Sequence, residues 1–196
     1  MNAEKNLVNL MKYMFSKRLI SARDGNVSFK PKDKKYFLIS PTSVRKNDLH
    51  QNQILKVHFD HAGNLSYDDK KGKPSRELHM HSFLLTNAKF FDKDTFVIHA
   101  HPPNVISYMG FDRTRELNKI KECFPEINVG NIGENVKYHD AGSMDLAKNC
   151  YDNLLNKDLV GLERHGTLSI DSDSDKIIED IETLEYYIGS YLKAEN

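Results

Sequence analysis

The 196-residue sequence has no tryptophan, only two cysteines and no excess of either charge. Lysine plus arginine and aspartate plus glutamate number 28 each, so the chain has no net positive field. Binding of a nucleic acid or an anionic membrane through bulk electrostatics is therefore not expected. A local basic pocket is still compatible with this balance.

The cysteines and the apolar runs exclude two further classes of protein. Cys123 and Cys150 fit neither a disulfide framework nor a paired-thiolate metal site, which need closer or more numerous thiols. No apolar run approaches the roughly 20 residues that span a bilayer, and no signal peptide is recognisable at the N-terminus. These absences predict a soluble, cytoplasmic protein, whose length fits one compact domain over residues 1–196.

Apolar residues recur at helical spacing in several segments, and polar caps mark where helices begin. Helices are expected over residues 3–18, 75–85, 104–109, 144–154 and from about 175 onward. The hydroxyl of Ser75 is the expected cap of the second helix, and that of Ser143 the expected cap of the fourth.

Short apolar or alternating segments bounded by turn residues predict the strands. The first predicted strand is short and ends at Phe29. The other predicted strands cover residues 37–40, 54–59, 95–101, 136–138 and 159–162. The segment Asp60–Asn64 favours a hairpin over a long crossover. The order of elements predicts an α/β fold of the α+β type, with a central, largely antiparallel β-sheet flanked by helices on both sides.

His99 and His101 are the first candidates for chemistry. Alternate side chains of a strand share a face, so these two imidazoles project together and can converge on one ion. A catalytic zinc site commonly uses three protein ligands and leaves one position open. His165 is the best third candidate, because it follows a predicted buried strand and precedes a glycine.

The other six histidines are less favourable. His79 and His81 lie on different sides of a predicted helix, which favours surface or packing roles. His50, His58 and His61 are expected in solvent near a turn, and the position of His139 is open.

Glu77 and its neighbours form a second cluster. A carboxylate near a helix start is favoured by the helix dipole, which is by itself an adequate structural reason for Glu77. Free amides at the helix start, with Ser75 and Arg76, would suit an anion such as phosphate. Asn26, Thr42 and Ser43 could add donors if their loops converge there.

The order of these motifs resembles the class II aldolase and adducin family, and within it the fuculose-phosphate aldolase branch. The resemblance covers nearly the whole chain. The matching segments are Gly25–Ser28, Ser40–Ser43, Lys73–Glu77, His99–Pro102 and Arg164–Gly166.

The resemblance implies a role for each candidate residue. His99, His101 and His165 would bind Zn²⁺, with Mn²⁺, Co²⁺ or Fe²⁺ as alternatives. Glu77 would be a further ligand of the metal or act as the acid and base of the reaction. The substrate phosphate would be surrounded by Asn26, Thr42, Ser43, Ser75 and Arg76.

Three positions depart from the family pattern. Ser43 replaces a glycine that lets the backbone approach phosphate, and Arg76 replaces a second serine. Arginine can also bind a carboxylate, which leaves an acid substrate open. The tyrosine that aldolases contribute from a neighbouring subunit has no clear counterpart, and the candidates are Tyr138, Tyr187 and Tyr191.

The implied reaction is the cleavage of a small ketose 1-phosphate to dihydroxyacetone phosphate and an aldehyde through a metal-stabilised enediolate. Glutamate at position 77 and the interval from His101 to His165 resemble the aldolase branch. The alternatives are a methylthioribulose-1-phosphate dehydratase, a phosphotetronate decarboxylase and a noncatalytic adducin-like interaction module. The resemblance also implies a homotetramer with active sites at subunit borders.

Overall fold

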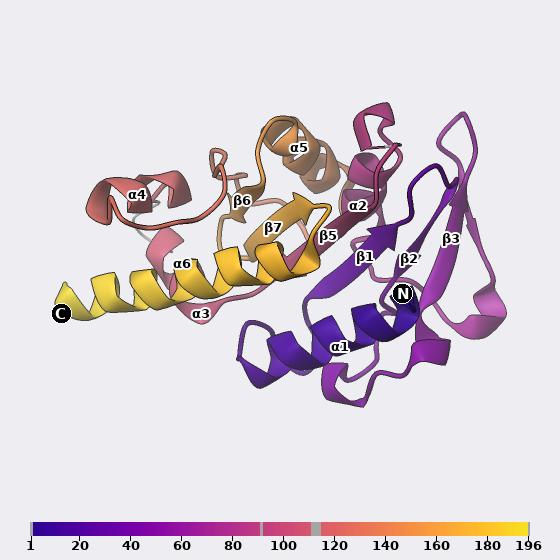
Figure 1. The fold of residues 1–196 in the computed structure, drawn as a ribbon, viewed down its shortest axis with the longest axis horizontal. Coiled ribbons are helices and arrows are strands. Elements are labelled where there is room, and N and C mark those ends of the chain that lie inside the picture. Colours follow the sequence, from indigo (N-terminus) through magenta and orange to yellow (C-terminus); the bar gives the residue numbers. More distant parts are fainter. Residues whose placement is uncertain (1, 91, 111–114, 196) are drawn as a thin grey trace.

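A computed structural model of the chain describes residues 2–90, 92–110 and 115–195. Within them, seven strands form one sheet in the order β4-β3-β2-β1-β5-β7-β6, and all neighbouring strands are antiparallel (Figure 1). The strands are β1 (Asn26–Lys30), β2 (Tyr36–Ile39), β3 (Leu55–Phe59), β4 (Leu65–Tyr67), β5 (Thr95–Ala100), β6 (Leu159–Leu162) and β7 (Gly166–Asp171). The predicted antiparallel sheet is thus confirmed.

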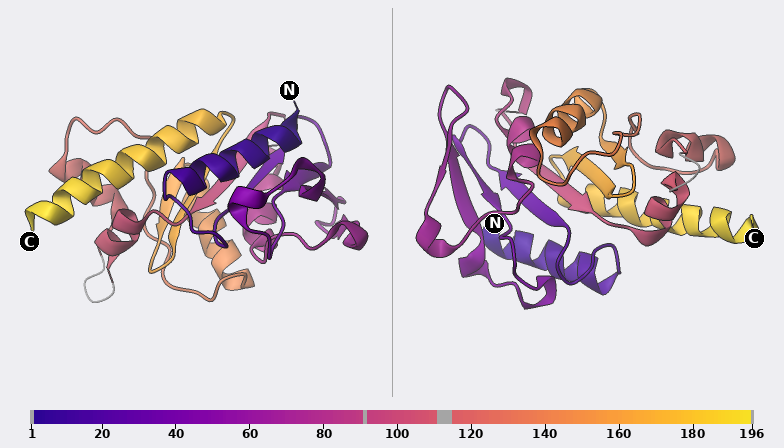
Figure 2. Two further views of the ribbon diagram at one scale, coloured as in Figure 1. Left: turned by 90° about the horizontal axis from the view of Figure 1, so that it is seen from below. Right: turned by 180° about the vertical axis from the view of Figure 1, so that it is seen from behind.

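Helices cover both faces of this sheet (Figures 1 and 2). The described α-helices are α1 (Ala3–Ser16), α2 (Leu78–Leu85), α3 (Pro103–Met109), α4 (Ile120–Cys123), α5 (Met144–Leu154) and α6 (Ser174–Ala194). None of the helices in the described ranges is both long and apolar enough to cross a membrane.

The two faces hold separate hydrophobic cores, because neighbouring residues of a strand point to opposite sides. On β5, Phe96, Ile98 and Ala100 pack in the core that includes α1, α3 and α6. Val97 packs in the opposite core, with α2 and α5. His99 is two residues after Val97 and points to the same side of the sheet, so it faces the layer formed by α2 and α5.

The structure differs from the sequence-based expectation at four places. Helix α2 begins at Leu78, with Glu77 at its N-cap position, so Ser75 is not the cap of the helix. Ser75 instead accepts a hydrogen bond from the Glu77 amide (3.3 Å) and stabilises the turn before it. Strands β4 and β7 were not predicted, and residues 136–138 form only an isolated bridge at Val136.

We expect Gly166→Ala to destabilise the protein because β7 begins against the backbone of β5. A Cβ at position 166 would lie 2.1 Å from the Ala100 carbonyl oxygen, so the strands would have to separate. Overpacking of this kind costs about 1–3 kcal/mol. The matched control is Gly63→Ala, where nothing lies within 4 Å of the added Cβ and only the strain of φ +81° remains, about 1 kcal/mol. Urea unfolding curves compare the two, and equal losses would contradict the steric explanation.

Candidate metal centre and substrate pocket

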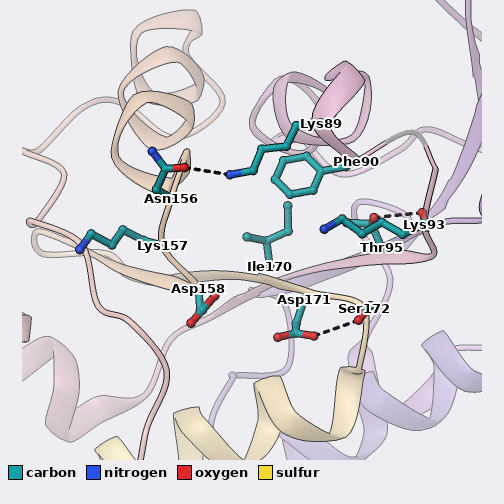
Figure 3. Close-up of a pocket in the computed structure, with 10 residues that line it drawn as sticks. All are labelled: Lys89, Phe90, Lys93, Thr95, Asn156, Lys157, Asp158, Ile170, Asp171 and Ser172. Carbon is teal, nitrogen blue, oxygen red and sulfur yellow. Dashed lines mark hydrogen bonds between the residues drawn. The ribbon is translucent and has the colours of Figure 1, made fainter.

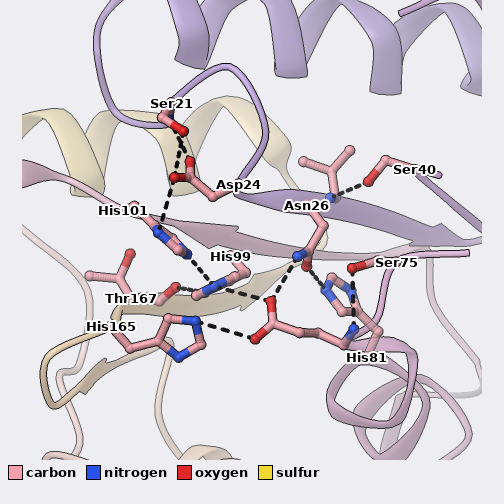
Figure 4. Close-up of polar contacts among 12 residues, drawn as sticks. Ser21, Asp24, Asn26, Ser40, Ser75, His81, His99, His101, His165 and Thr167 are labelled. Atoms are coloured by element: carbon pink, nitrogen blue, oxygen red, sulfur yellow. Dashed lines mark hydrogen bonds and ion pairs between the residues drawn. The ribbon is translucent and has the colours of Figure 1, made fainter. Parts of the chain in front are cut away.

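Three histidines meet at the end of β5. His99 and His101 project from the same side of that strand, and His165 comes from the turn between β6 and β7 (Figure 4). One nitrogen from each lies within 4.8 Å of the other two, and the Nε2 atoms of His99 and His101 are 2.7 Å apart. The structure thus brings together the three residues that the sequence selects as metal ligands.

The backbone of the β6–β7 turn explains the position of His165. Arg164 has φ +58°, a left-handed conformation that reverses the chain within three residues. The His165 amide then donates to the Leu162 carbonyl at 3.0 Å. Gly166 follows at the point where the turn contacts β5. The short turn therefore holds the imidazole directly beside the strand that supplies the other two.

The protonation of the histidines suits a cation. His99 Nδ1 lies 2.8 Å from the Thr167 carbonyl oxygen, which can only accept, so Nδ1 carries the hydrogen and Nε2 keeps a lone pair. Burial, reinforced by His165, lowers the pKa of His99 to about 3. Burial and the adjacent His99 lower the pKa of His101 to about 3 as well. Both imidazoles are thus neutral at physiological pH, as metal binding requires.

Glu77 adds a carboxylate to this group. Its Oε2 atom is 3.2 Å from His99 Nε2, and its Oε1 atom is 3.3 Å from His165 Nε2. The residue is only 6% exposed, and Oε1 has no hydrogen-bond partner. A buried carboxylate oxygen without a donor is costly unless a cation compensates it. The three imidazoles and this carboxylate therefore fit a divalent metal ion.

Asp24, which the sequence analysis does not single out, lies beside His101 at the candidate metal centre. Its Oδ2 atom lies 3.7 Å from His101 Nδ1, and both of its oxygens accept hydrogen bonds from Ser21 at 2.5 Å. Burial raises the pKa of Asp24, but the bonds from Ser21 and the nearby His101 outweigh it and lower the pKa overall. Such outer carboxylates orient a ligating imidazole.

A pocket of about 110 Å³ opens beside the metal centre. It is lined by four of the predicted phosphate residues, Asn26, Thr42, Ser75 and Arg76, together with Glu77, His101 and His165. The loops that carry these residues therefore converge. Ser43 does not line the pocket, but its φ of +60° is the left-handed conformation that glycine adopts most easily.

Three backbone amides at the start of α2 already have partners within the protein. The Ser75 amide donates to the Ser40 carbonyl at 3.1 Å, and the Leu78 amide donates to the Ser75 carbonyl at 3.0 Å. The Glu77 amide donates to the Ser75 hydroxyl. An anion in this pocket would rely on side chains instead.

Two basic residues of the pocket were not identified from the sequence. Arg23 and Lys46 line it together with Arg76. Lys46 is 3% exposed and its Nζ donates to the Pro41 carbonyl at 3.4 Å. Burial lowers the pKa of Lys46, while the charges of Asp24 and Glu77 raise it. The pocket thus has the local positive charge that the balanced composition leaves open.

His81 has the packing role expected of it, inside the protein rather than at the surface. It is fully buried and contacts Asn26 and Ser28 of β1. His79, on the same helix, is exposed, as are His50, His58 and His61, while His139 is half-buried. Helix α2 therefore turns one histidine toward the sheet and one toward solvent.

The candidate tyrosines lie at different places. Tyr138 is 55% exposed, and the guanidinium of Arg164 lies 6.0 Å from its ring centroid, so it borders the turn that holds His165. Tyr187 packs on Phe124, and the Tyr191 hydroxyl donates to Glu195 at 2.9 Å. Among these three tyrosines, Tyr138 is the one that contacts Arg164, the residue before His165.

A larger hollow of about 340 Å³ lies at the opposite end of β5 and β7 (Figure 3). Two of its charged groups already have partners: Lys89 donates to the Leu155 carbonyl, and Asp171 pairs with Lys176 at 2.6 Å. Its titratable side chains are lysines and aspartates. The hollow beside the histidines is therefore the better candidate for a reaction.

Comparison with known proteins identifies the family. A family model described as "Class II Aldolase and Adducin N-terminal domain" matches residues 5–192. The chain belongs to this family. It is similar to an L-fuculose phosphate aldolase of Methanococcus maripaludis, with 26% identity over 94% of this chain and 97% of the relative. A second L-fuculose phosphate aldolase, from Methanococcus vannielii, is 27% identical over 96% and 98% of the two chains.

A solved structure shows the same fold. The sugar-phosphate aldolase from Thermotoga maritima superposes with a TM-score of 0.80, over 97% of this chain and 93% of the other. The two sequences are 20% identical, so this likeness concerns the class II aldolase architecture. The fold and the family expected from the motifs are both confirmed.

We expect the stability of the metal-free protein to fall in acid partly through His81. Burial lowers the pKa of His81 to about 3 from 6.5, so below pH 6.5 the unfolded chain binds more protons than the folded one. The stabilisation is complete above pH 6.5 and is lost as the pH falls toward 3. His81→Gln should therefore show a flatter pH dependence, by up to about 1.4 kcal/mol per pH unit between pH 6 and 4. Urea unfolding at a series of pH values measures the free energy of unfolding of both proteins. An equal fall in this free energy between pH 6 and 4 for the two proteins would refute this cause.

Proposed function

We propose that this class II aldolase cleaves a small ketose 1-phosphate to dihydroxyacetone phosphate and an aldehyde, with a divalent metal, zinc in the first instance, at His99, His101 and His165. The proposal rests chiefly on one observation: His101, His165 and the buried Glu77 carboxylate line the same pocket as a set of basic and hydroxyl side chains, and His99 lies directly behind them. The curated relatives are named for a sugar phosphate of this class.

The basic end of the pocket would bind the phosphate. Arg23, Lys46 and Arg76 supply positive charge, and Thr42 and Ser75 supply hydroxyls. Charge-assisted hydrogen bonds of this kind are stronger than neutral ones and fix the direction in which the sugar enters. The carbonyl end of the substrate would then point toward the histidines and Glu77.

Glu77 would move a proton at the carbon that becomes nucleophilic. In the cleavage direction the bond between C3 and C4 breaks and its electron pair remains on C3, while the C4 hydroxyl gives its proton to a water molecule in the pocket and becomes the aldehyde carbonyl. A proton held by Glu77 then goes to C3 and completes dihydroxyacetone phosphate. A bound divalent metal would polarise the substrate's carbonyl and adjacent hydroxyl oxygens and stabilise the negative charge.

The position of Glu77 suits this transfer. It lies at the start of α2, in the wall of the pocket and largely out of water, where a carboxylate can exchange a proton with a substrate rather than with solvent. Asn26 holds Oε2 at 2.8 Å, while Oε1 has no hydrogen-bond partner. One oxygen is thus anchored and the other is available.

A second candidate reaction is decarboxylation of a phosphorylated sugar acid. Arg76 lines the pocket in place of a second serine, and a guanidinium binds a carboxylate as well as it binds a phosphate. Carbon dioxide release from such an acid, without dihydroxyacetone phosphate from any ketose, would favour this reaction. We also propose a homotetramer and a cytoplasmic location, for which size measurement and fractionation are the direct tests.

Replacing a proposed ligand should remove the metal. We expect His99→Ala to weaken zinc binding by more than about 100-fold, because loss of even an outer partner of a metal site costs 10–100-fold. Competition with a chromophoric chelator measures the affinity. The control is His58→Ala, which removes an exposed histidine and should leave the affinity unchanged. Zinc affinity in His99→Ala equal to that of the control would exclude this centre.

Removing the charge of Glu77 should separate metal binding from turnover. We expect Glu77→Gln to keep the fold and the metal, since the three imidazoles persist, and to lower kcat by about 100-fold or more, as loss of a general acid and base does. The assay is dihydroxyacetone phosphate release from a panel of ketose 1-phosphates, with elemental analysis of the same sample. Full turnover in this variant would show that Glu77 does not move the proton.

A further inference from the structure

A chain of three hydrogen bonds connects the sheet to the Glu77 carboxylate. Asn26 Nδ2 donates to Glu77 Oε2 at 2.8 Å, and the Asn26 carbonyl oxygen contacts His81 Nε2. On its other side, His81 Nδ1 lies 2.5 Å from the Ser28 hydroxyl. These four residues are at most 6% exposed, so the bonds among them are largely shielded from water.

The fold dictates this arrangement. Asn26 and Ser28 are two residues apart on β1 and share the side that faces α2. Glu77 and His81 are four residues apart, so they lie on the same side of α2, one turn from each other. Asn26 is also the direct strand partner of His99. The strand and the helix therefore present two groups each to the same buried layer.

Only one set of hydrogen positions satisfies all four residues. Asn26 donates from its NH₂ group to Glu77, so its carbonyl oxygen, which can only accept, faces His81. His81 Nε2 must then carry a hydrogen, and Nδ1 must accept from the Ser28 hydroxyl. A neutral imidazole with the hydrogen on Nε2 meets both conditions, and burial keeps His81 neutral by lowering its pKa.

We propose that His81 is a positioning residue that fixes the amide of Asn26 with its NH₂ group toward Glu77. A flipped amide would place its carbonyl oxygen against the carboxylate, which is repulsive, and an unrestrained amide would sample both orientations. The hydrogen bond from His81 selects one of them, and through it holds the Glu77 oxygen in place. This inference rests on the proposed role of Glu77.

The Ser28 hydroxyl is the last group of this hydrogen-bonded chain. It donates to Nδ1 and thereby selects the tautomer whose hydrogen is on Nε2. A leucine at position 81 would fill much of the space but could not donate to Asn26. The amide nitrogen of a glutamine can reach the place of Nε2, so glutamine keeps the donor that the proposal requires.

The kinetic test compares His81→Leu, His81→Gln and, as matched control, His79→Leu on the same helix but exposed. We expect His81→Leu to lower kcat about 10- to 100-fold, as loss of a hydrogen bond that supports a charged group does, with little change in KM. His81→Gln should recover most of kcat, and His79→Leu should match the wild type. If glutamine is as harmful as leucine, the donor is not what matters and the proposal is wrong.

A double-mutant cycle asks whether His81 acts through Asn26. Once Asn26→Ala has removed the amide, adding His81→Leu should lower kcat no further. Independent, multiplying losses would overturn the proposal. The thermal unfolding midpoint of each variant is measured alongside the cycle. If His81→Gln and His81→Leu unfold at the same temperature but only His81→Gln restores kcat, the loss of kcat in His81→Leu comes from lost positioning and not from lost stability.

The amide itself provides a readout that does not depend on activity. In metal-free protein labelled with ¹⁵N-asparagine, the Asn26 side-chain signals are identified by their absence in Asn26→Ala. Two sharp, separate NH₂ resonances are expected in the wild type and in His81→Gln, and broadened or merged resonances in His81→Leu. Unchanged resonances in His81→Leu would refute the inference, even if the enzyme cleaves ketose phosphates. Broadened resonances in a protein with no cleavage activity would instead count against the proposed reaction.

Discussion

The pairing of β5 with β1 on one side and with β7 on the other is the constraint on which the rest of the site depends. The register places Asn26 opposite His99, and Thr167 directly beside the imidazole whose hydrogen its carbonyl accepts. The same register requires Gly166 where β7 meets Ala100. A shift of one residue in either pairing would turn His99 toward the opposite core and dismantle the metal centre.

The second constraint is the cost of burying Glu77. An isolated ionised carboxylate inside a protein is strongly unfavourable, and His99 and His101, whose pKa values burial lowers to about 3, do not supply a positive charge. Asn26 stabilises one oxygen, and the other is unsatisfied among the described side chains. A divalent cation among the histidines would offset the remaining cost. The metal and the carboxylate are thus coupled, and each makes the burial of the other favourable.

Much of this arrangement can be predicted from the sequence where the argument is local. The two-residue period of a strand places His99 and His101 on one side, and helical periodicity locates α1 and α6 to within a few residues. No strand is predicted for the segment of β7, although Leu168 and Ile170 alternate there with Thr167 and Ser169. Strand β4, with three residues, is too short for periodicity to detect.

The residues that could not be predicted depend on which loops meet. Lys46 and Arg23 look like ordinary surface cations in the sequence, and only the sheet order brings them beside Arg76. His81 differs from His79 only in the side of α2 on which it lies, which is decided by the packing of that helix on β1. Its contact with Asn26 joins two elements about fifty residues apart in the chain.

The central claim, that a metal ion lies among three histidines beside a buried carboxylate, is tested most directly by anomalous diffraction from crystals of the zinc-loaded protein, with data collected on both sides of the zinc absorption edge. The account predicts one peak per chain, at about 2.0 to 2.1 Å from a ring nitrogen of each of His99, His101 and His165. Absence of a peak there in zinc-saturated crystals, or a peak bound by other residues, would contradict it.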